Sequence, residues 1–126
     1  MVEEAAALAS RLKHRLIKKD WTISTAESCT GGMISSLLTD ISGASAWFKQ
    51  GWIVYSNESK MRELGVESTA FDEGGYGAVS HKVAVQMARG ARYKSGSNVS
   101  IAVMHISGLV TLHLSVVPSF DGGQVF

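Results

Sequence analysis

The sequence predicts an α/β fold with three layers, in which helices pack on both faces of a mostly central mixed sheet. Segments with helical periodicity alternate along the chain with short apolar segments rich in β-branched residues, a pattern typical of helices packed on a sheet. The chain has 126 residues, of which 45% are hydrophobic and 18% charged. This size and balance are those of one globular domain. We therefore expect residues 1–126 to form a single domain.

The N-terminal segment predicts an amphipathic helix over residues 2–19. Apolar residues recur there at helical spacing and basic residues take the remaining positions; the apolar set is Ala5, Leu8, Ala9, Leu12 and Leu16. Residues 21–26 are rich in β-branched and aromatic side chains and predict a strand. Gly31 and Gly32 then form a turn that leads into an apolar helix over residues 33–38.

A second strand is expected at residues 52–55, which form an apolar run. Ser56 and Asn57 follow as helix-capping residues, and Gly65 ends the short helix that they begin.

The glycines at positions 74, 75 and 77 predict a loop, after which Ser80 is expected to cap another helix. Gly90 within that helix indicates a close packing contact. One face of the helix is apolar and is formed by Val83, Ala84, Met87, Ala88 and Ala91.

Two strands are expected near the C-terminus, because apolar residues alternate over 99–103 and again over 110–116. A turn is expected at 121–123 and a last strand segment at 124–126. Residues 95–120 contain no Asp, Glu, Lys or Arg, yet they alternate like strands and include Pro118, so we do not expect a transmembrane helix there.

Composition excludes several classes of function. The net charge of +1 gives no strong field for nucleic acid or anionic membrane. Cys29 is the single cysteine, so neither an internal disulfide nor a thiolate metal cluster can form. The N-terminus is acidic where a signal peptide would be basic. We expect a cytoplasmic protein.

The turn between the first strand and the next helix is the best candidate for chemistry. Ser28 lies there, followed by Thr30, Gly31 and Gly32. Such a turn exposes a side chain and offers backbone N–H groups near Gly31 to an oxyanion. The alternative is that Ser28 or Thr30 only caps the helix.

A serine nucleophile needs a base, and release of an amine needs an acid. Tyr55 closes the second expected strand and Lys60 lies in the opening turn of the next helix, so both are expected at the same sheet edge as Ser28. The alternatives are a half-buried aromatic residue for Tyr55 and a solvated lysine for Lys60.

Ordered segments of the chain resemble one known family. These segments are Thr25-Ala-Glu-Ser-Cys-Thr-Gly-Gly32, Ser45-Ala-Trp-Phe48, Gly51, Tyr55-Ser-Asn-Glu-Ser-Lys60, Leu64-Gly-Val66 and Tyr76-Gly-Ala-Val-Ser80. They are similar to the CinA C-terminal, nicotinamide-mononucleotide deamidase family, over about the first four-fifths of the chain.

The resemblance implies a CinA C-terminal-like fold and an amidohydrolase. The implied reaction converts nicotinamide mononucleotide and water to nicotinate mononucleotide and ammonia, with no cofactor and no metal. By position, Ser28 matches the family nucleophile, and Tyr55 and Lys60 match its catalytic partners. The expected substrate-binding residues are Thr30, Gly31, Gly32 and Asn57. The resemblance also implies a homodimer.

The chain departs from the family pattern after Val103. Where the family has a strand ending in Thr-Gly-Ile-Ala-Gly-Pro and then a glycine-rich loop, this chain continues from residues 104–108 directly into 109–112. We interpret this as a loop deletion. The family's last, arginine-bearing helix is also not found in residues 1–126.

Other residues carry weaker predictions. Cys29 is expected to be a small buried hydrophobic residue rather than the nucleophile. Glu27 is expected either to orient Ser28 or Lys60 or to bind a backbone N–H group of the turn. His105 replaces a small family residue and is either a base or a structural residue. The other histidines do not share ligand spacing, so metal binding is not expected.

Two alternative functions remain open at this stage. The departure after Val103 fits a non-catalytic member of the same fold that acts as a binding or interaction module. The basic residues between Arg11 and Lys19 fit a small nucleic-acid-binding domain, although a solvated helix face is the favoured explanation for them.

Overall fold

The computed structural model describes residues 2–71, 76–106 and 109–116. Its sheet contains β1 (Ile23–Glu27), β2 (Phe48–Ile53), β3 (Val99–Ile106) and β4 (Leu109–Val116). The strand order is β2-β1-β3-β4, with β1 parallel to both of its neighbours and β4 antiparallel to β3. The sheet is therefore mixed, as the sequence predicts.

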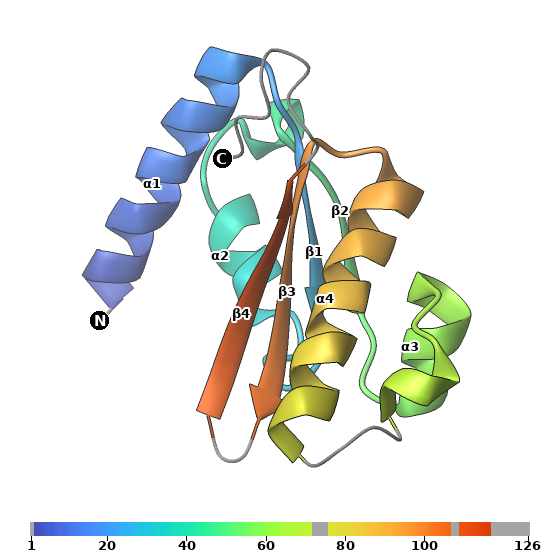
Figure 1. Cartoon of the computed structure of the whole chain (residues 1–126). Helices are drawn as coiled ribbons and strands as arrows, with labels where there is room; N and C mark the ends of the chain where they lie inside the picture. Colours follow the sequence, from blue (N-terminus) through green and yellow to red (C-terminus); the bar gives the residue numbers. More distant parts are fainter. Residues whose placement is uncertain (1, 72–75, 107–108, 117–126) are drawn as a thin grey trace.

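Helices cover both faces of this sheet (Figure 1). On one face lie α1 (Val2–Lys19) and α2 (Met33–Thr39), and on the other lie α3 (Asn57–Leu64) and α4 (Tyr76–Ser95). Two short 3₁₀ turns, η1 (Ala44–Ala46) and η2 (Ser68–Phe71), complete the connections. The predicted three-layer arrangement is confirmed.

The core is divided between the two sheet faces, because side chains in a strand alternate from one face to the other. Ile23 of β1 and Ile101 of β3 pack with Trp47 on the α1 and α2 side. Ala26 and Ala102 pack against α4 on the opposite side. The small alanines let the long helix α4 approach the sheet closely.

The structure confirms several element boundaries that local sequence signals predict. The helix predicted at 2–19 is α1. Ser56 caps α3, since its Oγ accepts a hydrogen bond from the Ser59 N–H at 3.1 Å, and Gly65 ends α3 with a left-handed φ of 70°. Gly90 is needed where α4 meets α3, because a Cβ there would overlap the carbonyl oxygen of Leu64. The predicted close contact is confirmed.

Other boundaries differ from the prediction. Helix α4 begins at Tyr76, so Ser80 is not its cap and Gly77 lies inside it. One glycine costs a helix only about 1 kcal/mol, which the packing of α4 on the sheet offsets. Strand β2 covers 48–53 rather than 52–55, because pairing with β1 selects its length. The predictions for residues 74, 75 and 121–126 lie outside the described residues.

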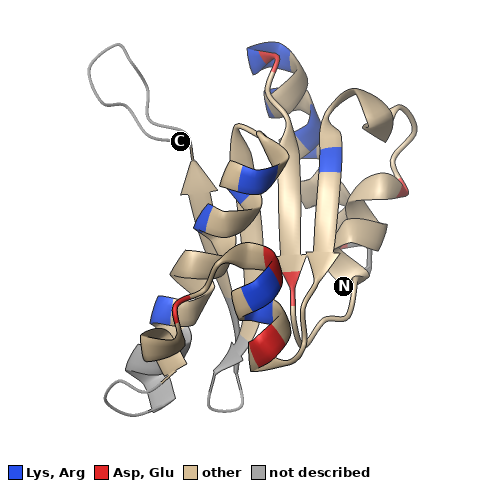
Figure 2. Cartoon of the chain, turned by 90° about the vertical axis from the view of Figure 1, so that its right-hand side faces the viewer, with Lys and Arg blue, Asp and Glu red and all other residues tan. Residues whose placement is uncertain are grey.

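A buried carboxylate joins β1 to α2. Glu27 is the one acidic residue in the four strands, and Figure 2 shows that Lys and Arg lie mainly on the helices. The Glu27 side chain is fully buried. Oε1 accepts hydrogen bonds from Thr30 Oγ1 (2.6 Å) and from the N–H groups of Gly32 (3.2 Å) and Ile34 (2.9 Å). Oε2 accepts from the N–H (2.8 Å) and Oγ (2.6 Å) of Ser35.

These hydrogen bonds keep Glu27 ionised. Burial raises the pKa of the Glu27 carboxyl, but the hydrogen bonds from Ser35, Thr30 and the helix N–H groups outweigh it and hold the pKa below its ordinary value of 4.5. The negative charge also lies at the positive end of α2. Glu27 thus satisfies the first N–H groups of a helix whose N-cap residue, Gly32, has no side chain to do so.

We expect Glu27→Gln to lower the free energy of unfolding by about 2–4 kcal/mol at neutral pH, because an amide NH₂ would face the Ser35 donors. The folded-state pKa is lowered, so the contribution of Glu27 is complete above pH 4.5 and is lost as the pH falls through the folded-state value. Urea unfolding from neutral to acidic pH should show the difference between parent and variant narrowing below pH 4.5. Glu4→Gln, on the exposed surface of α1, is the control, and an equal loss in both variants would contradict the assignment.

Candidate active site

Ser28 lies at the carboxyl edge of the sheet, directly after β1. Its N–H donates to the Val103 carbonyl at 3.2 Å, and the Val54 N–H donates to the Glu27 carbonyl at 2.9 Å. The end of β1 is therefore hydrogen-bonded to the chain on both of its sides. Ser28 is only 7% exposed, and its hydroxyl has no hydrogen-bond partner among the described residues. Glu27, rather than Ser28, caps α2, so the interpretation of Ser28 as a helix cap is wrong.

The turn after Ser28 uses most of its N–H groups internally. The Gly31 N–H donates to the Ser28 carbonyl at 3.2 Å and the Gly32 N–H donates to Glu27. Thr30 also does not cap α2, because its hydroxyl donates to Glu27. The N–H groups of Cys29 and Thr30, in contrast, have no acceptor in the described part of the chain. An oxyanion held at this turn therefore has donors at 29 and 30, whereas those at Gly31 and Gly32 are occupied.

Lys60 lies in the first turn of α3 and is only 4% exposed. Within the described ranges it makes no ion pair and no hydrogen bond through its side chain. Burial lowers the pKa of Lys60 below its ordinary value of 10.5, and electrostatic interaction with Cys29 opposes this shift in part. That interaction indicates that the amine lies near the turn after β1. A buried amine without a carboxylate partner is suited to accept a proton.

Tyr55 and Asn57 lie at the same edge of the sheet as Ser28. Tyr55 follows the end of β2 and is 75% exposed, while Asn57 is the exposed first residue of α3. The hydrogen bond between Val54 and Glu27 keeps the ends of β1 and β2 together. The fold therefore brings Ser28, Tyr55 and Lys60 to one edge, while their catalytic roles stay a prediction.

Cys29 is exposed, so the expectation of a buried hydrophobic residue is wrong. Strand β1 ends at Glu27, and side-chain alternation no longer determines which way residue 29 points. Ser28 remains buried. The side chain of Cys29 faces solvent, and that of Thr30, the next residue, donates to Glu27.

The role of Glu27 was one of two alternatives from the sequence, and the structure selects backbone binding. An acidic residue just before a glycine-rich turn and a helix is the sequence signal that favours such a cap.

Burial, together with Arg89 and His81, lowers the pKa of His113 on β4. The side chain of His105 lies outside the described part. Within that part, no three His, Cys, Asp or Glu side chains gather as a metal site would require.

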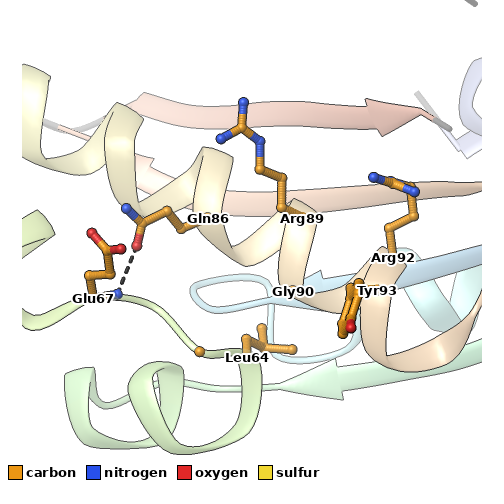
Figure 3. Close-up of a pocket in the computed structure, with 8 residues that line it drawn as sticks. Leu64, Glu67, Gln86, Arg89, Gly90, Arg92 and Tyr93 are labelled. Atoms are coloured by element: carbon orange, nitrogen blue, oxygen red, sulfur yellow. Dashed lines mark hydrogen bonds between the residues drawn. The ribbon is translucent and has the colours of Figure 1, made fainter. Parts of the chain in front are cut away.

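A hollow lies between the end of α3 and α4 (Figure 3). It has a volume of about 390 Å³ and its lining includes Leu64, Glu67 and Gln86. The Glu67 N–H donates to Gln86 Oε1 at 2.7 Å across its rim. Arg92 extends toward β4, where its Nε donates to Ser115 Oγ at 3.2 Å. No serine, cysteine, histidine or lysine lines this hollow, so it lacks the serine and the neutral amine that the proposed site residues provide.

No helix in the described part of the chain is both long and apolar enough to span a membrane.

The chain is similar to known proteins over most of its length. The model of the CinA C-terminal domain family matches residues 5–111. The nicotinamide-nucleotide amidohydrolase PncC of Shewanella oneidensis is 44% identical over 108 residues, which is 86% of this chain and 25% of that protein. The protein of the same name from Enterobacter agglomerans is 44% identical over 90 residues, covering 71% of this chain and 54% of its own length. The chain thus spans only part of these relatives.

Solved structures show the same fold. The competence/damage-inducible protein CihA of Agrobacterium tumefaciens superposes with a TM-score of 0.81 at 35% identity, covering 97% of this chain and 77% of that one. A CinA superfamily protein of Escherichia coli gives a TM-score of 0.74 at 29% identity, over 91% and 78% of the two chains. The predicted family resemblance and CinA-like fold are confirmed, and the chain belongs to the CinA C-terminal domain family.

Proposed function

We propose that the chain is an amidohydrolase that converts nicotinamide mononucleotide to nicotinate mononucleotide and ammonia. Ser28 is the nucleophile, Lys60 the base and Tyr55 a second proton-transfer group. Relatives named nicotinamide-nucleotide amidohydrolase PncC support the substrate class. The observation that carries the proposal is the buried amine of Lys60, which has no carboxylate partner among the described residues and lies beside the turn of Ser28.

The first half of the reaction forms an acyl-enzyme. Neutral Lys60 removes the proton of the Ser28 hydroxyl, and Oγ attacks the carboxamide carbon. The carbonyl oxygen becomes an oxyanion that accepts hydrogen bonds from the N–H groups of residues 29 and 30. The C–N bond then breaks, and the nitrogen leaves as ammonia after taking the proton that Lys60 holds, directly or through Tyr55, so that Lys60 is neutral again.

The second half uses the same groups. Water gives a proton to Lys60 and attacks the ester carbon, and the same N–H groups hold the second oxyanion. The C–O bond to Ser28 breaks, Oγ regains a proton and nicotinate mononucleotide leaves. The Ser28 N–H donates to Val103 of β3, and the preceding residue, Glu27, accepts from Val54 after β2. These bonds hold the backbone at Ser28, which supports this proposal because catalysis depends on a fixed attack geometry.

We expect Ser28→Ala to reduce ammonia release from nicotinamide mononucleotide by several orders of magnitude, about a million-fold in well-studied serine enzymes. Ser36→Ala makes the same chemical change on the exposed surface of α2 and is the matched control. Ammonia should be measured at saturating substrate with the purified chain. Equal activity in Ser28→Ala and the parent would favour the non-catalytic binding module.

The lowered pKa of Lys60 predicts a pH dependence. Lysine is a base only after losing its proton, so kcat/KM should rise with pH and level off below pH 10.5. Lys60→Arg keeps a protonated side chain and should lower kcat/KM by about 10²–10⁴-fold while removing the rise. The exposed Lys94→Arg is the control. A pH profile that is the same in Lys60→Arg and the parent would show that another group is the base.

The expected homodimer is also a proposal, and the edge of the sheet supports it. Leu112 and Leu114 of β4 are 56% and 49% exposed, and β4 has no neighbour on its outer side in the described sheet. Exposed apolar strands at a sheet edge favour association. Light scattering at micromolar concentration should give a dimer, and Leu114→Lys should shift it toward the monomer. A parent that is monomeric under these conditions would contradict this proposal.

A further inference from the structure

Cys29 has an unusual position for a thiol. It follows Ser28 directly, it is exposed to solvent, and it is the single cysteine of the 126-residue sequence. The Val54–Glu27 hydrogen bond holds the ends of β1 and β2 together. Cys29, two residues after β1, and Lys60, in the first turn of α3, therefore lie at the same edge of the sheet. The electrostatic interaction of Cys29 with Lys60 agrees with this placement. A group attached to the Cys29 sulfur would therefore lie next to Ser28 and at the sheet edge that Lys60 shares.

Two buried polar side chains at this turn point to a ligand site. Ser28 is 7% exposed and Lys60 4% exposed, and neither side chain has a hydrogen-bond partner among the described residues. Buried polar groups are normally satisfied within the protein. The fully buried side-chain atom without a partner among the described residues is Nε1 of Trp47, so the polar ends of Ser28 and Lys60 are not sealed from solvent. Two largely buried side chains whose polar ends stay accessible and unpaired are suited to bind a ligand, and the exposed Cys29 follows Ser28 directly.

We propose that Cys29 is a modification site at which a low-molecular-weight disulfide reversibly blocks the Ser28 and Lys60 site. The proposal rests on the proposed function for its effect on activity. The mixed disulfide on Cys29 places a bulky group where the substrate would approach Ser28.

The chemistry is thiol–disulfide exchange. The Cys29 thiolate attacks one sulfur of the small disulfide, a new S–S bond forms at Cys29 Sγ, and the original S–S bond breaks. The leaving sulfur departs as a thiolate and takes up a proton. Because Cys29 is the single cysteine, no internal thiol can displace the adduct. The adduct therefore persists until an external thiol reverses the exchange.

The test uses the purified chain and glutathione disulfide as the probe. Intact mass should show one glutathionyl group per chain, because the sequence contains one thiol. Ammonia release should fall by about tenfold or more as the adduct forms, since the group occupies the substrate's approach. Dithiothreitol should restore it. Cys29→Ser should gain no mass and should keep the activity of its own untreated sample in the presence of the probe.

The outcomes separate this proposal from the proposed function. A folded parent that gains no adduct while the urea-unfolded chain does would overturn the modification site, and so would an adduct that leaves activity unchanged. If the untreated parent releases no ammonia, the proposed function fails. Calorimetry with nicotinamide mononucleotide then decides the remainder: weaker binding to the adduct supports the block, and equal binding or none overturns it.

Discussion

The hydrogen bonds of the Glu27 carboxylate fix the geometry on which the rest of the site depends. A fully buried anion requires several donors, and Glu27 finds them at the start of α2. The chain must therefore turn back sharply after β1, with left-handed glycines at 31 and 32. In that turn the Gly32 N–H reaches Glu27 and the Gly31 N–H reaches Ser28. The position of Ser28 follows from the hydrogen bonds that this carboxylate accepts.

Under the proposed function, the same interaction limits where a substrate can place negative charge. The N-terminus of a helix ordinarily attracts anions, but at α2 the anion is already supplied by Glu27. Under the proposed mechanism, the oxyanion instead uses the N–H groups of residues 29 and 30, which precede the helix. The turn thus separates two tasks: its later N–H groups stabilise the fold, and its earlier ones remain open for chemistry.

The sheet keeps the two buried ionisable groups apart. Glu27 faces α2, whereas Lys60 belongs to α3 on the opposite face. A carboxylate paired with Lys60 would hold the amine protonated, and such a lysine is a poor base. The donors of α2 stabilise the charge of Glu27 and lower its pKa, which suits a structural anion. Burial disfavours the charge of Lys60 and lowers its pKa, which suits the neutral base of the proposed mechanism.

The sequence by itself determined the elements that depend on near neighbours. The helix at 2–19, the Ser56 cap, the Gly65 stop and the strands after residue 98 follow from periodicity and capping, which act within a few residues. Their positions at strand-to-helix junctions pointed to Ser28, Tyr55 and Lys60 as candidate site residues, and the family resemblance gave them roles. Only the tertiary structure decided that Glu27 caps α2, that Cys29 points outward and that β2 starts at Phe48. Each of these depends on a partner that the fold brings into contact, and local propensity carries no information about such partners.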